Sequence, residues 1–314
     1  MEPLVSVVIT AYNAETTIAE TIESVLGQTY PALEIIVADD GSTDATAEIV
    51  RRFPAVKLLQ QTNMGQPVAR NLGIRASTGQ FLAFIDSDDL WHPDKIRLQI
   101  QTLMECPEAG WSYCDCLHFA EAVSAPLYKN SQLLKPHSGW VQHRLLYENF
   151  ISSPTPVIRR EVFEIVGNWD AGVRQCEDWN MWLQIASRYP LVYVPSILAY
   201  HRHQNTSLSS QWNLPGYLDA NLAVQEKAAE AYPLLRRHLS RAKATIYARF
   251  ALAFLREGRQ LPAVRCLWQA TTLRPTYTRL YMRWPLVLLP PFVVQALYRL
   301  RRSALLARSG IVTW

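Results

Sequence analysis

The sequence lacks several features that would place a protein in a class at first sight. Its five cysteines are an odd number and no two are spaced as C-x-x-C, so neither a disulfide framework nor a zinc ribbon is supported. No G-x-G-x-x-G follows the first apolar run and no G-x-x-x-x-G-K-[ST] occurs anywhere, which disfavours a dinucleotide-binding Rossmann site and a P-loop. No basic residue precedes the first apolar run, so we expect no secretory signal and a cytoplasmic location.

Acidic residues are missing from the end of the chain. None follows Glu257, whereas nine arginines do. Residues 1–210 carry 15 Lys and Arg against 23 Asp and Glu, and residues 211–314 carry 16 against 4. The composition, 49% hydrophobic and 18% charged over 314 residues, excludes wholesale disorder, collagen and coiled coil, and it suffices for a large domain with an appendage. We therefore predict two units, residues 1–210 and residues 211–314, with different partners.

Short apolar runs alternate with amphipathic stretches in the first 120 residues. The runs are rich in β-branched or aromatic residues, as strands covered on both faces are, and they span residues 4–10, 33–39, 56–60 and 81–86. Helical spacing between them predicts helices at residues 16–26, 45–53 and 67–76, and Pro93 suits the first turn of a fourth helix. This strand–helix–strand repetition predicts an α/β fold with a doubly wound, mostly parallel sheet.

Polar side chains follow three of these predicted strands at the point where each strand ends. The three segments are Thr10–Asn13, Asp39–Ser42 and Asp86–Asp89, and together they carry five acidic residues. In doubly wound sheets, ligands bind beyond the carboxyl ends of the strands. We therefore expect the three segments to meet at one rim and to form a ligand site.

The acidic pair after the fourth strand has the spacing of a cation site. Asp86 and Asp88 are two residues apart, so on an extended segment both carboxylates point to one side. Paired carboxylates suit Mg²⁺ or Mn²⁺, and such an ion can bridge them to a diphosphate that the carboxylates alone would repel. The alternative is that residues 86–89 form a turn and a helix cap.

Five segments resemble, in order and spacing, the family 2 glycosyltransferases of the GT-A fold. They are VSVVITAYN at residues 5–13, QTYPALEIIVADDGSTD at 28–44, GQPVARNLGI at 65–74, GQFLAFIDSDD at 79–89 and CEDWNMWL at 176–183, the last being similar to the family's E-D-x-x-x-W segment. The resemblance covers residues 3–210, roughly two thirds of the chain. It implies a GT-A catalytic domain and does not identify the substrate. The helical patterns of the remaining residues predict a C-terminal α-helical extension after this domain.

The resemblance also implies a set of donor-binding residues. They are Thr10, Tyr12, Asn13, Asp39, Asp40, Arg70, Asp86 and Ser87. Thr10, Tyr12 and Asp40 would hold the nucleotide base, with Tyr12 near the uracil ring if the donor is a UDP-sugar. Arg70 would bring positive charge toward phosphate or ribose, and Asp86 would contact ribose or sugar. For Asp39 the alternative is a structural acid at a strand end or helix cap.

The same resemblance implies that Asp88 and His203 bind the metal and that Asp178 is the catalytic base; for His203 a structural role is the alternative. Breaking an anomeric C–O bond requires stabilisation of a departing nucleoside diphosphate, which a bound cation supplies. The attacking hydroxyl must lose its proton, and a partly desolvated carboxylate beside Trp179 and Trp182 is a suitable base. One base without a candidate nucleophile predicts a single displacement, with inversion at the anomeric carbon.

Helical patterns dominate the second unit, at residues 217–231, 235–257 and 261–273. Its last apolar run, residues 284–298, contains three prolines, lies between arginines within residues 279–302, and is shorter than the ~20 residues of a spanning helix. Aromatic ends and flanking arginines suit a segment that lies on an anionic membrane surface, and the alternative is a helix packed on the catalytic domain. Nucleic acid is not expected as a partner, because the arginines interleave with an apolar run.

These observations predict an enzyme that transfers a sugar, with inversion, from a nucleotide-diphospho-sugar such as a UDP-sugar to a hydroxyl of a glycan or glycolipid acceptor. We expect it to act in cell-surface polysaccharide or glycolipid synthesis, as a peripheral protein at the inner face of the cell membrane. The alternatives are transfer to a polyprenyl phosphate, a non-catalytic module that binds nucleotide-sugars or glycans, and a nucleotidyltransferase. The Gly-rich, Lys-bearing first loop of nucleotidyltransferases is absent, which disfavours the last.

Overall fold

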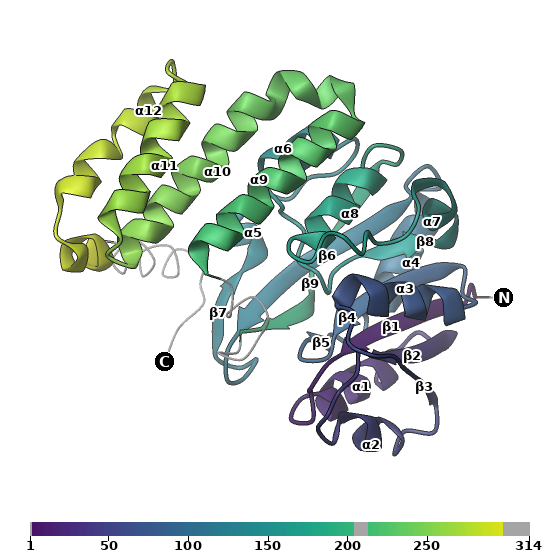
Figure 1. Ribbon diagram of the computed structural model, residues 1–314. Coiled ribbons are helices and arrows are strands. Elements are labelled where there is room, and N and C mark those ends of the chain that lie inside the picture. The colour runs from purple at the N-terminus through teal and green to yellow at the C-terminus, as the bar shows by residue number, and fades with distance from the viewer. Residues whose placement is uncertain (1, 204–212, 298–314) are drawn as a thin grey trace. The chain divides into compact units, whose positions relative to one another are not determined.

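The computed structural model describes residues 2–203 and 213–297, and the chain divides into two compact units (Figure 1). The first unit comprises Met1–Val141 and Phe150–His203, and the second comprises Gln142–Asn149 and Gln204–Trp314. The predicted boundary at residues 210 and 211 lies outside the described residues. The five cysteines all lie within the described residues, and none of them forms a disulfide.

The strands of the described residues form one sheet in the order β3-β2-β1-β4-β8-β6-β9-β5, and β7 pairs with β6. Their bounds are β1 (Val5–Ala11), β2 (Leu33–Asp39), β3 (Val56–Gln60), β4 (Phe81–Asp86), β5 (Leu90–Trp91), β6 (Trp111–Phe119), β7 (Pro126–Lys129), β8 (Val157–Arg159) and β9 (Leu191–Arg202). The strands from β3 to β4 are parallel, β8 is antiparallel to both of its neighbours, and β6 and β9 are parallel. The four predicted strands and the mostly parallel sheet are therefore confirmed.

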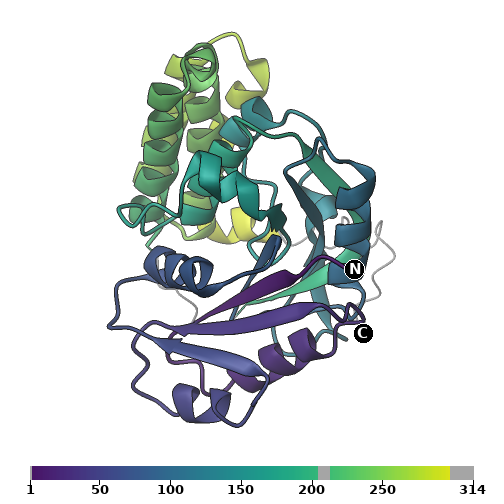
Figure 2. The ribbon, with the colours of Figure 1, turned by 90° about the vertical axis from the view of Figure 1, so that its right-hand side faces the viewer.

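Helices of the first unit cover both faces of this sheet, as the views from two sides show (Figures 1 and 2). Their bounds are α1 (Ile18–Leu26), α2 (Thr46–Val50), α3 (Gln66–Ala76), α4 (Lys95–Glu105), α5 (Asn130–Leu133), α7 (Arg160–Val166) and α8 (Glu177–Ile185). The four predicted helices correspond to α1 to α4. Helix α3 has Pro67 in its first turn, where the missing N–H costs no hydrogen bond.

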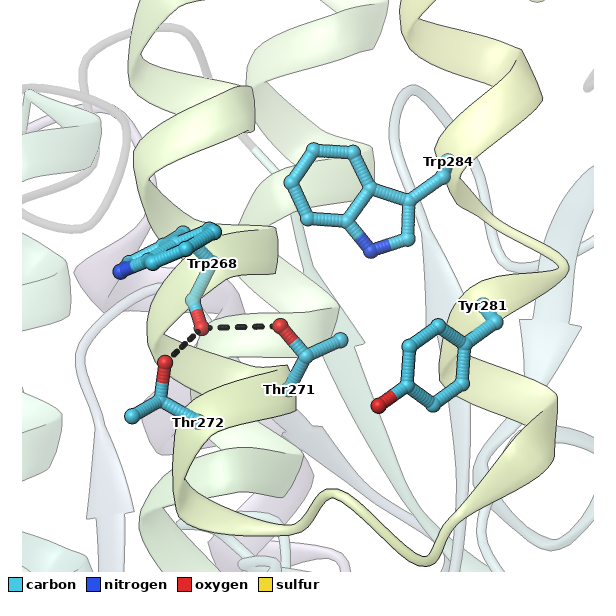
Figure 3. A pocket seen from close by; sticks show the side chains of 5 residues that line it. All are labelled: Trp268, Thr271, Thr272, Tyr281 and Trp284. Atoms are coloured by element: carbon cyan, nitrogen blue, oxygen red, sulfur yellow. Dashed lines mark hydrogen bonds between the residues drawn. The ribbon is translucent and has the colours of Figure 1, made fainter.

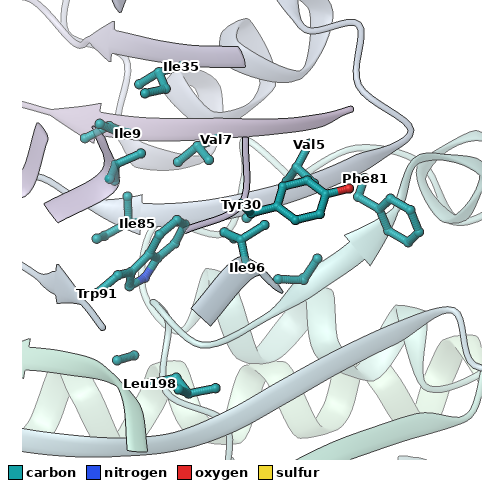
Figure 4. Close-up of a cluster of buried hydrophobic side chains, with 14 of the residues drawn as sticks. Val5, Val7, Ile9, Tyr30, Ile35, Phe81, Ile85, Trp91, Ile96 and Leu198 are labelled. Atoms are coloured by element: carbon teal, nitrogen blue, oxygen red, sulfur yellow. The ribbon is translucent and has the colours of Figure 1, made fainter. Parts of the chain in front are cut away.

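Alternate residues of β1 and β4 point to opposite faces, and each face has its own helices. Val7 and Ile9 belong to a buried cluster with Ile96 of α4 and residues of α1 (Figure 4). On the other face, the ring of Phe84 lies 5.9 Å from that of Phe163 in α7, and α3 packs closely on Val8. Burial on both faces explains why these strands read as continuous apolar runs in the sequence.

The carboxyl ends of β2, β1 and β4 lie side by side, because these strands are parallel neighbours in the sheet. Ala11 pairs with Asp39 in the register of β1 and β2, and Thr10 pairs with Asp86 in the register of β1 and β4. The three polar segments therefore meet at one rim, as the sequence predicted.

The second unit is helical. Its elements are α6 (Gln142–Tyr147), α9 (Leu214–Ala231), the short 3-10 helix η2 (Pro233–Leu235), α10 (Arg236–Arg256), α11 (Gln260–Leu273), α12 (Thr278–Tyr281) and the 3-10 helix η3 (Trp284–Leu288). Helix α10 lies between α9 and α11 and also contacts α6 (Figure 1). The three helices predicted after residue 210 are confirmed as α9, α10 and α11.

The apolar run near the end of the chain does not form one continuous helix. It begins as η3, is extended at Leu289 and is helical again over residues 291–297. Tyr298 and the arginines at 299, 301 and 302 lie outside the described residues. Within residues 2–203 and 213–297, no helix combines the length and the apolar character needed to cross a membrane.

Candidate active site

Three elements of the first unit meet at the carboxylate of Asp86, the last residue of β4. Its Oδ1 accepts hydrogen bonds from the Oγ1 of Thr10 at 2.9 Å and from the guanidinium of Arg70 at 3.0 Å. It also accepts a hydrogen bond from the side-chain amide of Gln66. Thr10 comes from β1, and Gln66 and Arg70 come from α3. The position of Asp86 is therefore fixed by its neighbours.

Arg70 is a buried arginine, 1% exposed, that joins two acidic segments. Its guanidinium pairs with Asp86 at 3.0 Å and with Glu177 of α8 at 2.9 Å, and it lies 4.4 Å from the ring centroid of Trp169. A buried charge is stable only when it is paired and hydrogen-bonded, so this bridge holds the start of α8 beside the end of β4. The predicted donor-binding residue Arg70 thus directs its charge to carboxylates of the site itself.

The acidic start of α8 carries the predicted base. Asp178 is half-buried, and its Oδ1 accepts a hydrogen bond from the backbone N–H of Trp179 at 2.6 Å. Burial raises the pKa of Glu177 to about 7; the Arg70 guanidinium opposes this rise and the Asp178 carboxylate adds to it. Cys176 precedes them with a left-handed φ of 57°, a conformation that costs free energy in a residue other than glycine. Such strain recurs at functional sites, and here it sets the direction in which the helix begins.

Asp88 has the surroundings of a cation ligand. Burial and, after it, the carboxylates of Asp89 and Asp86 together raise its pKa to about 7, and the nearby His201 opposes part of this rise. Among the described residues, no other side chain donates a hydrogen bond to Asp88, whereas buried Asp89 accepts one from His201 at 3.1 Å and one from the backbone of Arg202 at 2.9 Å. A carboxylate that accepts no side-chain hydrogen bond among the described residues and lies beside two further carboxylates fits the Mg²⁺ or Mn²⁺ that the sequence predicts.

Asp39 and Asp40 shape the loop after β2. Asp39 is buried and accepts hydrogen bonds from the backbone of Ser42 at 3.0 Å and the side chain of Gln60 at 3.1 Å. Asp40 accepts hydrogen bonds from the backbone N–H groups of Met64 at 2.9 Å and Gly65 at 2.8 Å, and from a glutamine side chain. Both carboxylates therefore hold neighbouring loops in place, which agrees with the structural alternative for Asp39.

The loop after β1 presents one aromatic side chain to solvent. Tyr12 is 43% exposed, and Asn13 has a left-handed φ of 48°. The side chain of Asn13 accepts a hydrogen bond from the backbone of Thr43 at 2.9 Å, which ties the loops after β1 and β2 together. Ser87 is buried, and its backbone N–H donates to Thr10 at 3.1 Å. Tyr12 is thus the predicted donor-binding side chain with an open aromatic face at this rim.

His203 lies just beyond the end of β9 and is exposed. Its Nε2 is 2.9 Å from the Nδ1 of His118 in β6, and Tyr128 stacks on the His118 ring. Burial, together with the other two histidines, lowers the pKa of His118 to about 2. Burial opposes protonation of His201 too, but the Asp89 carboxylate outweighs it and raises the pKa of His201 to about 9.

Sequence reasoning missed several residues that complete the site. Glu177 lies in the quoted acidic segment but was given no role, and Gln66 lies in the GQPVARN segment. Asp89 ends the Asp86–Asp89 segment, and its partner His201 is 112 positions away along the chain. Ser153, which accepts from Arg70 at 3.0 Å, lies in a segment without a recognisable motif. Glu177, Gln66 and Asp89 lie in segments that the sequence analysis quotes, so they could have been selected from the sequence. The pairs that they form with distant residues can be seen only in the fold.

The fold and this rim together define a class of protein. Three neighbouring parallel strands end at one rim, and two of these ends carry carboxylates. A buried arginine holds a second acidic segment beside them, and an aromatic side chain lies exposed at the rim. The class is that of the glycosyltransferases with a GT-A fold.

The sequence profile of Glycosyl transferase family 2 matches residues 6–164, and the chain belongs to that family. It is 39% identical over 109 residues to TuaG of Bacillus subtilis, a glycosyltransferase assigned to teichuronic acid biosynthesis. The aligned segment covers 33% of this chain and 43% of TuaG. It is 42% identical over 113 residues to the Escherichia coli UDP-Glc:α-D-GlcNAc-diphosphoundecaprenol β-1,3-glucosyltransferase WfaP, covering 35% of this chain and 45% of WfaP. The matched segment is thus less than half the length of either relative.

Two solved structures share the fold. The crystal structure of Staphylococcus aureus TarS 1–349 in complex with UDP-GlcNAc has a TM-score of 0.61 at 16% identity, covering 88% of this chain and 92% of that one. The mannosyltransferase PcManGT of Pyrobaculum calidifontis, in complex with GDP-Man and Mn²⁺, has a TM-score of 0.62 at 20% identity, covering 98% and 86%. Because the sequence identities are this low, the structural similarity shows a shared GT-A fold and nothing about the substrates of this chain.

Proposed function

We propose that this protein transfers a sugar from a nucleotide-diphospho-sugar, a UDP-sugar in the first instance, to an acceptor hydroxyl with inversion. The observation that carries the proposal is the Arg70 bridge, which ties the Asp86 rim to the Glu177–Asp178 segment. The Arg70 ion pairs thereby hold the proposed donor site and the candidate base next to each other. One relative is named for teichuronic acid biosynthesis and another for α-D-GlcNAc-diphosphoundecaprenol, and both names support a glycan or glycolipid acceptor in cell-surface polysaccharide synthesis.

The loops at the rim would bind the donor. Tyr12 offers an exposed ring against the base, while Thr10, Asp39 and Asp40 fix the loops around it through the hydrogen bonds described above. Asn13 joins the first two loops, and Asp86 faces ribose or sugar with Ser87 behind it. The UDP-GlcNAc and GDP-Man complexes of proteins with this fold support a nucleotide-sugar as the ligand.

Asp88, with His203 as the second predicted ligand, would hold a divalent cation, since two further carboxylates lie beside Asp88 and no side chain of the described residues donates a hydrogen bond to it. Bound there, Mg²⁺ or Mn²⁺ supplies electrophilic stabilisation of the nucleoside diphosphate leaving group. Arg70 keeps the Asp86 carboxylate in place, because its buried guanidinium pairs with that carboxylate at 3.0 Å. The Mn²⁺ complex of PcManGT supports the choice of cation class.

Asp178 would remove the proton of the acceptor hydroxyl as that hydroxyl attacks the anomeric carbon. Its half-buried position limits hydration, and the Arg70 charge next to Glu177 offsets part of the repulsion between these two acids. With one base and no nucleophile assigned, the attack is a single displacement. The bond from the anomeric carbon to the nucleoside diphosphate breaks as the bond to the acceptor oxygen forms. The transferred sugar therefore has the inverted anomeric configuration in the product.

The test is a donor panel followed by one substitution. We expect one nucleotide-sugar to bind with Mn²⁺ and to yield a product of inverted anomeric configuration by NMR. Asp178→Asn should lower kcat by about 10²-fold or more with donor affinity little changed. Asp219→Asn, an exposed acid of the second unit, is the matched control and should behave as wild type.

Four outcomes would overturn parts of this proposal. Equal losses of donor affinity and turnover in Asp178→Asn would make Asp178 a binding residue. Binding without any transfer or hydrolysis would favour a non-catalytic nucleotide-sugar or glycan module. Retention of configuration, or transfer only to a polyprenyl phosphate, would replace the proposed reaction by another one.

We further propose that the second unit attaches the protein to the anionic inner face of the cell membrane. Large apolar side chains lie exposed on α11, η3 and the segments around them; they are Leu261, Trp268, Met282, Leu288 and Phe292. Trp268, Tyr281 and Trp284 line a pocket of about 410 Å³ (Figure 3). Indole and phenol rings suit the membrane interface, and the nine arginines without acids after Glu257 suit anionic lipid.

A further inference from the structure

Basic and polar side chains of the second unit gather where α6 contacts the start of α10. On each helix, the last of three such residues follows the other two by three and four positions, so the three share one face. We call these side chains the α6–α10 patch. They are His143, Arg144 and Tyr147 of α6 and Arg237, His238 and Arg241 of α10.

Contacts between the two helices hold the patch together. The Oη of Tyr147 is 3.0 Å from the Nδ1 of His238, although the two residues are 91 positions apart along the chain. The guanidinium carbon of Arg241 lies 5.5 Å from the centroid of the Tyr147 ring. The rings of His143 and His238 are 6.5 Å apart. The fold therefore places side chains from two distant segments at one position on the surface.

The hydrogen bonds of His238 leave a donor available at Tyr147. The Nε of Arg237 donates to the Nε2 of His238 at 3.1 Å, so that ring nitrogen carries no proton. The proton of the ring is then on Nδ1, which donates to the Tyr147 hydroxyl. Within the described part of the chain, no acceptor takes the proton of that hydroxyl. The patch thus offers an O–H donor beside its guanidinium groups.

The positive charges of the patch have no acidic partners among the described residues. Arg144, Arg237 and Arg241 are all exposed, and none of them forms an ion pair there. Glu148, the next residue after α6, pairs with Arg249 of α10 instead. Three guanidinium groups are therefore available to a ligand.

This accumulation of charge opposes the stability of the unit itself. The first turn of α10 contains Arg237 and His238 and no acidic residue, whereas the dipole of a helix favours acidic residues there. Burial, the charge of Arg144 and the neighbouring His238 all lower the pKa of His143. Cations that neither pair with an acid nor suit the start of their helix indicate a ligand of opposite charge.

We propose that the α6–α10 patch binds a diphosphate group. A guanidinium binds phosphate oxygens through two parallel hydrogen bonds. Three guanidinium groups and the Tyr147 hydroxyl match the several oxygens and charges of a diphosphate better than the single charge of a phosphodiester. Nucleoside diphosphates and lipid diphosphates both carry this group. The site belongs to the second unit alone, uses no metal ion and does not rest on the sugar-transfer proposal.

Titration in EDTA tests the patch without the proposed metal site, where a diphosphate would need a cation. Full-length protein is titrated with inorganic pyrophosphate in a calorimeter, and with orthophosphate for comparison. We expect one pyrophosphate to bind per chain, more weakly as salt is added, and orthophosphate to bind at least about 10-fold more weakly because it carries less charge. Absence of saturable binding, or equal affinities for the two anions, would overturn the proposal.

Substitutions locate the site. Arg237→Gln and Arg241→Gln change exposed side chains, so the fold should be retained, and each should weaken pyrophosphate binding by about 10-fold, as for a lost hydrogen bond to a charged group. Arg265→Gln is the matched control, because it removes the same charge from an exposed position of α11. It should bind as wild type. Equal losses in all three variants would show attraction by net charge and contradict the assignment.

The imidazole of His143 provides a second readout. A bound diphosphate adds negative charge beside Arg144 and His238, so the pKa of His143 should rise when pyrophosphate saturates the protein. Proton NMR of the histidine rings against pH measures the change, and His143→Gln identifies the resonance. A pKa of His143 that does not change at saturation would place the anion elsewhere and overturn the proposal.

The same resonance distinguishes the sources of the diphosphate. UDP and geranyl diphosphate are each titrated in EDTA, and the one that shifts the His143 resonance at the lower concentration identifies the class of ligand. Suppose instead that pyrophosphate does not bind, and that Arg237→Gln with Arg241→Gln weakens sedimentation with phosphatidylglycerol vesicles. The patch would then be a membrane contact and the proposal would be wrong. Absent sugar transfer with intact pyrophosphate binding would refute only the sugar-transfer proposal.

Discussion

At the scale of single residues, Asp88 and Lys95 both carry charges that burial opposes, but with different surroundings. Asp88 lies among carboxylates at the rim, where a ligand can supply the missing positive charge. Lys95 of α4 is fully buried with its ammonium 4.1 Å from the ring centroid of Trp91, and its Nζ has no hydrogen-bond partner in the described residues. The first arrangement favours ligand binding, and the second affects only stability.

Asp88→Asn should abolish metal-dependent turnover and leave the fold intact. In EDTA the variant should unfold at the same temperature as wild type or at a higher one, because it no longer repels Asp86 and Asp89. Transfer rates against Mn²⁺ concentration and thermal melts in EDTA check both expectations. Wild-type turnover of the variant in EDTA would show that Asp88 is no metal ligand.

Lys95→Met should raise the free energy of unfolding at pH 7. Burial lowers the pKa of Lys95 from 10.5 to about 8, so between these values the unfolded chain binds more protons than the folded one. The free energy of unfolding of the wild type therefore rises between pH 8 and pH 10.5 relative to that of Lys95→Met. The rise is about 3 kcal/mol, because each unit of the pKa shift corresponds to about 1.36 kcal/mol. Urea unfolding of both proteins from pH 7 to 10.5 measures the difference, and a constant difference would refute the low pKa.

At the scale of elements, the seating of α3 on the sheet decides where Arg70 lies. Gly73, one turn after Arg70, faces Val8 of β1 so closely that an added Cβ would lie 2.3 Å from a Val8 methyl carbon. The helix can approach the sheet because this position has no side chain. Close approach in turn lets Arg70 reach both Asp86 and Glu177.

Gly73→Ala should push α3 off β1. We expect a loss of about 1–3 kcal/mol in the free energy of unfolding, as for other overpacked cores, with weaker donor binding because Arg70 moves. Adding Val8→Ala makes room for the new methyl group and should restore part of both quantities. Urea unfolding and donor titration of the two variants provide the measurement. An unchanged donor affinity in Gly73→Ala would show that the position of α3 does not affect donor binding.

Sequence patterns were sufficient for the strands and helices that bury apolar residues on both faces of the sheet. The run at residues 81–86 predicts β4 because every position is apolar up to the terminal Asp86. Pairings between distant segments carry no local signal, and Arg70 with Glu177 or Asp89 with His201 could be found only in the fold. Helix α6 shows the same limit, since it belongs to the helical unit although its sequence neighbours on both sides belong to the first.

Site residues divide in the same way. The motifs placed Asp86 and Asp88 at the rim correctly, because the end of a buried parallel strand fixes where they lie. They did not reveal that Asp40 holds the backbone of Met64 and Gly65, since the loop that it binds has no regular pattern. A polar residue in a motif can thus hold the backbone of a site in place, or it can contact the ligand.

At the scale of the whole molecule, membrane attachment should depend on the exposed apolar residues of the second unit. The variant Leu288→Ser with Phe292→Ser removes two side chains that are 86% and 71% exposed, so its fold should be retained. We expect wild type to sediment with anionic vesicles, more weakly at high salt because each nearby arginine contributes about 1 kcal/mol at low salt. The double variant should remain largely in the supernatant.

The matched control for this experiment is Ile165→Ser, which removes a side chain that is 62% exposed in the first unit. It should sediment like wild type. Truncation before Arg279 is the poorer test, because Leu280 is buried against Ala248 and Ala270 and its loss would disturb the helices. Wild-type protein that stays in the supernatant with both neutral and anionic vesicles would end the membrane proposal.

The buried arginine of the site also gives the molecule an optical property. Trp169, on which Arg70 lies, is 5.4 Å from the ring of Trp182, which in turn is 5.6 Å from that of Trp111. Indoles at such separations couple their electronic transitions, and the emission of the first depends on the charge above it. Any ligand that draws Arg70 toward or away from Asp86 will therefore change the near-ultraviolet circular dichroism and the fluorescence of the unlabelled protein.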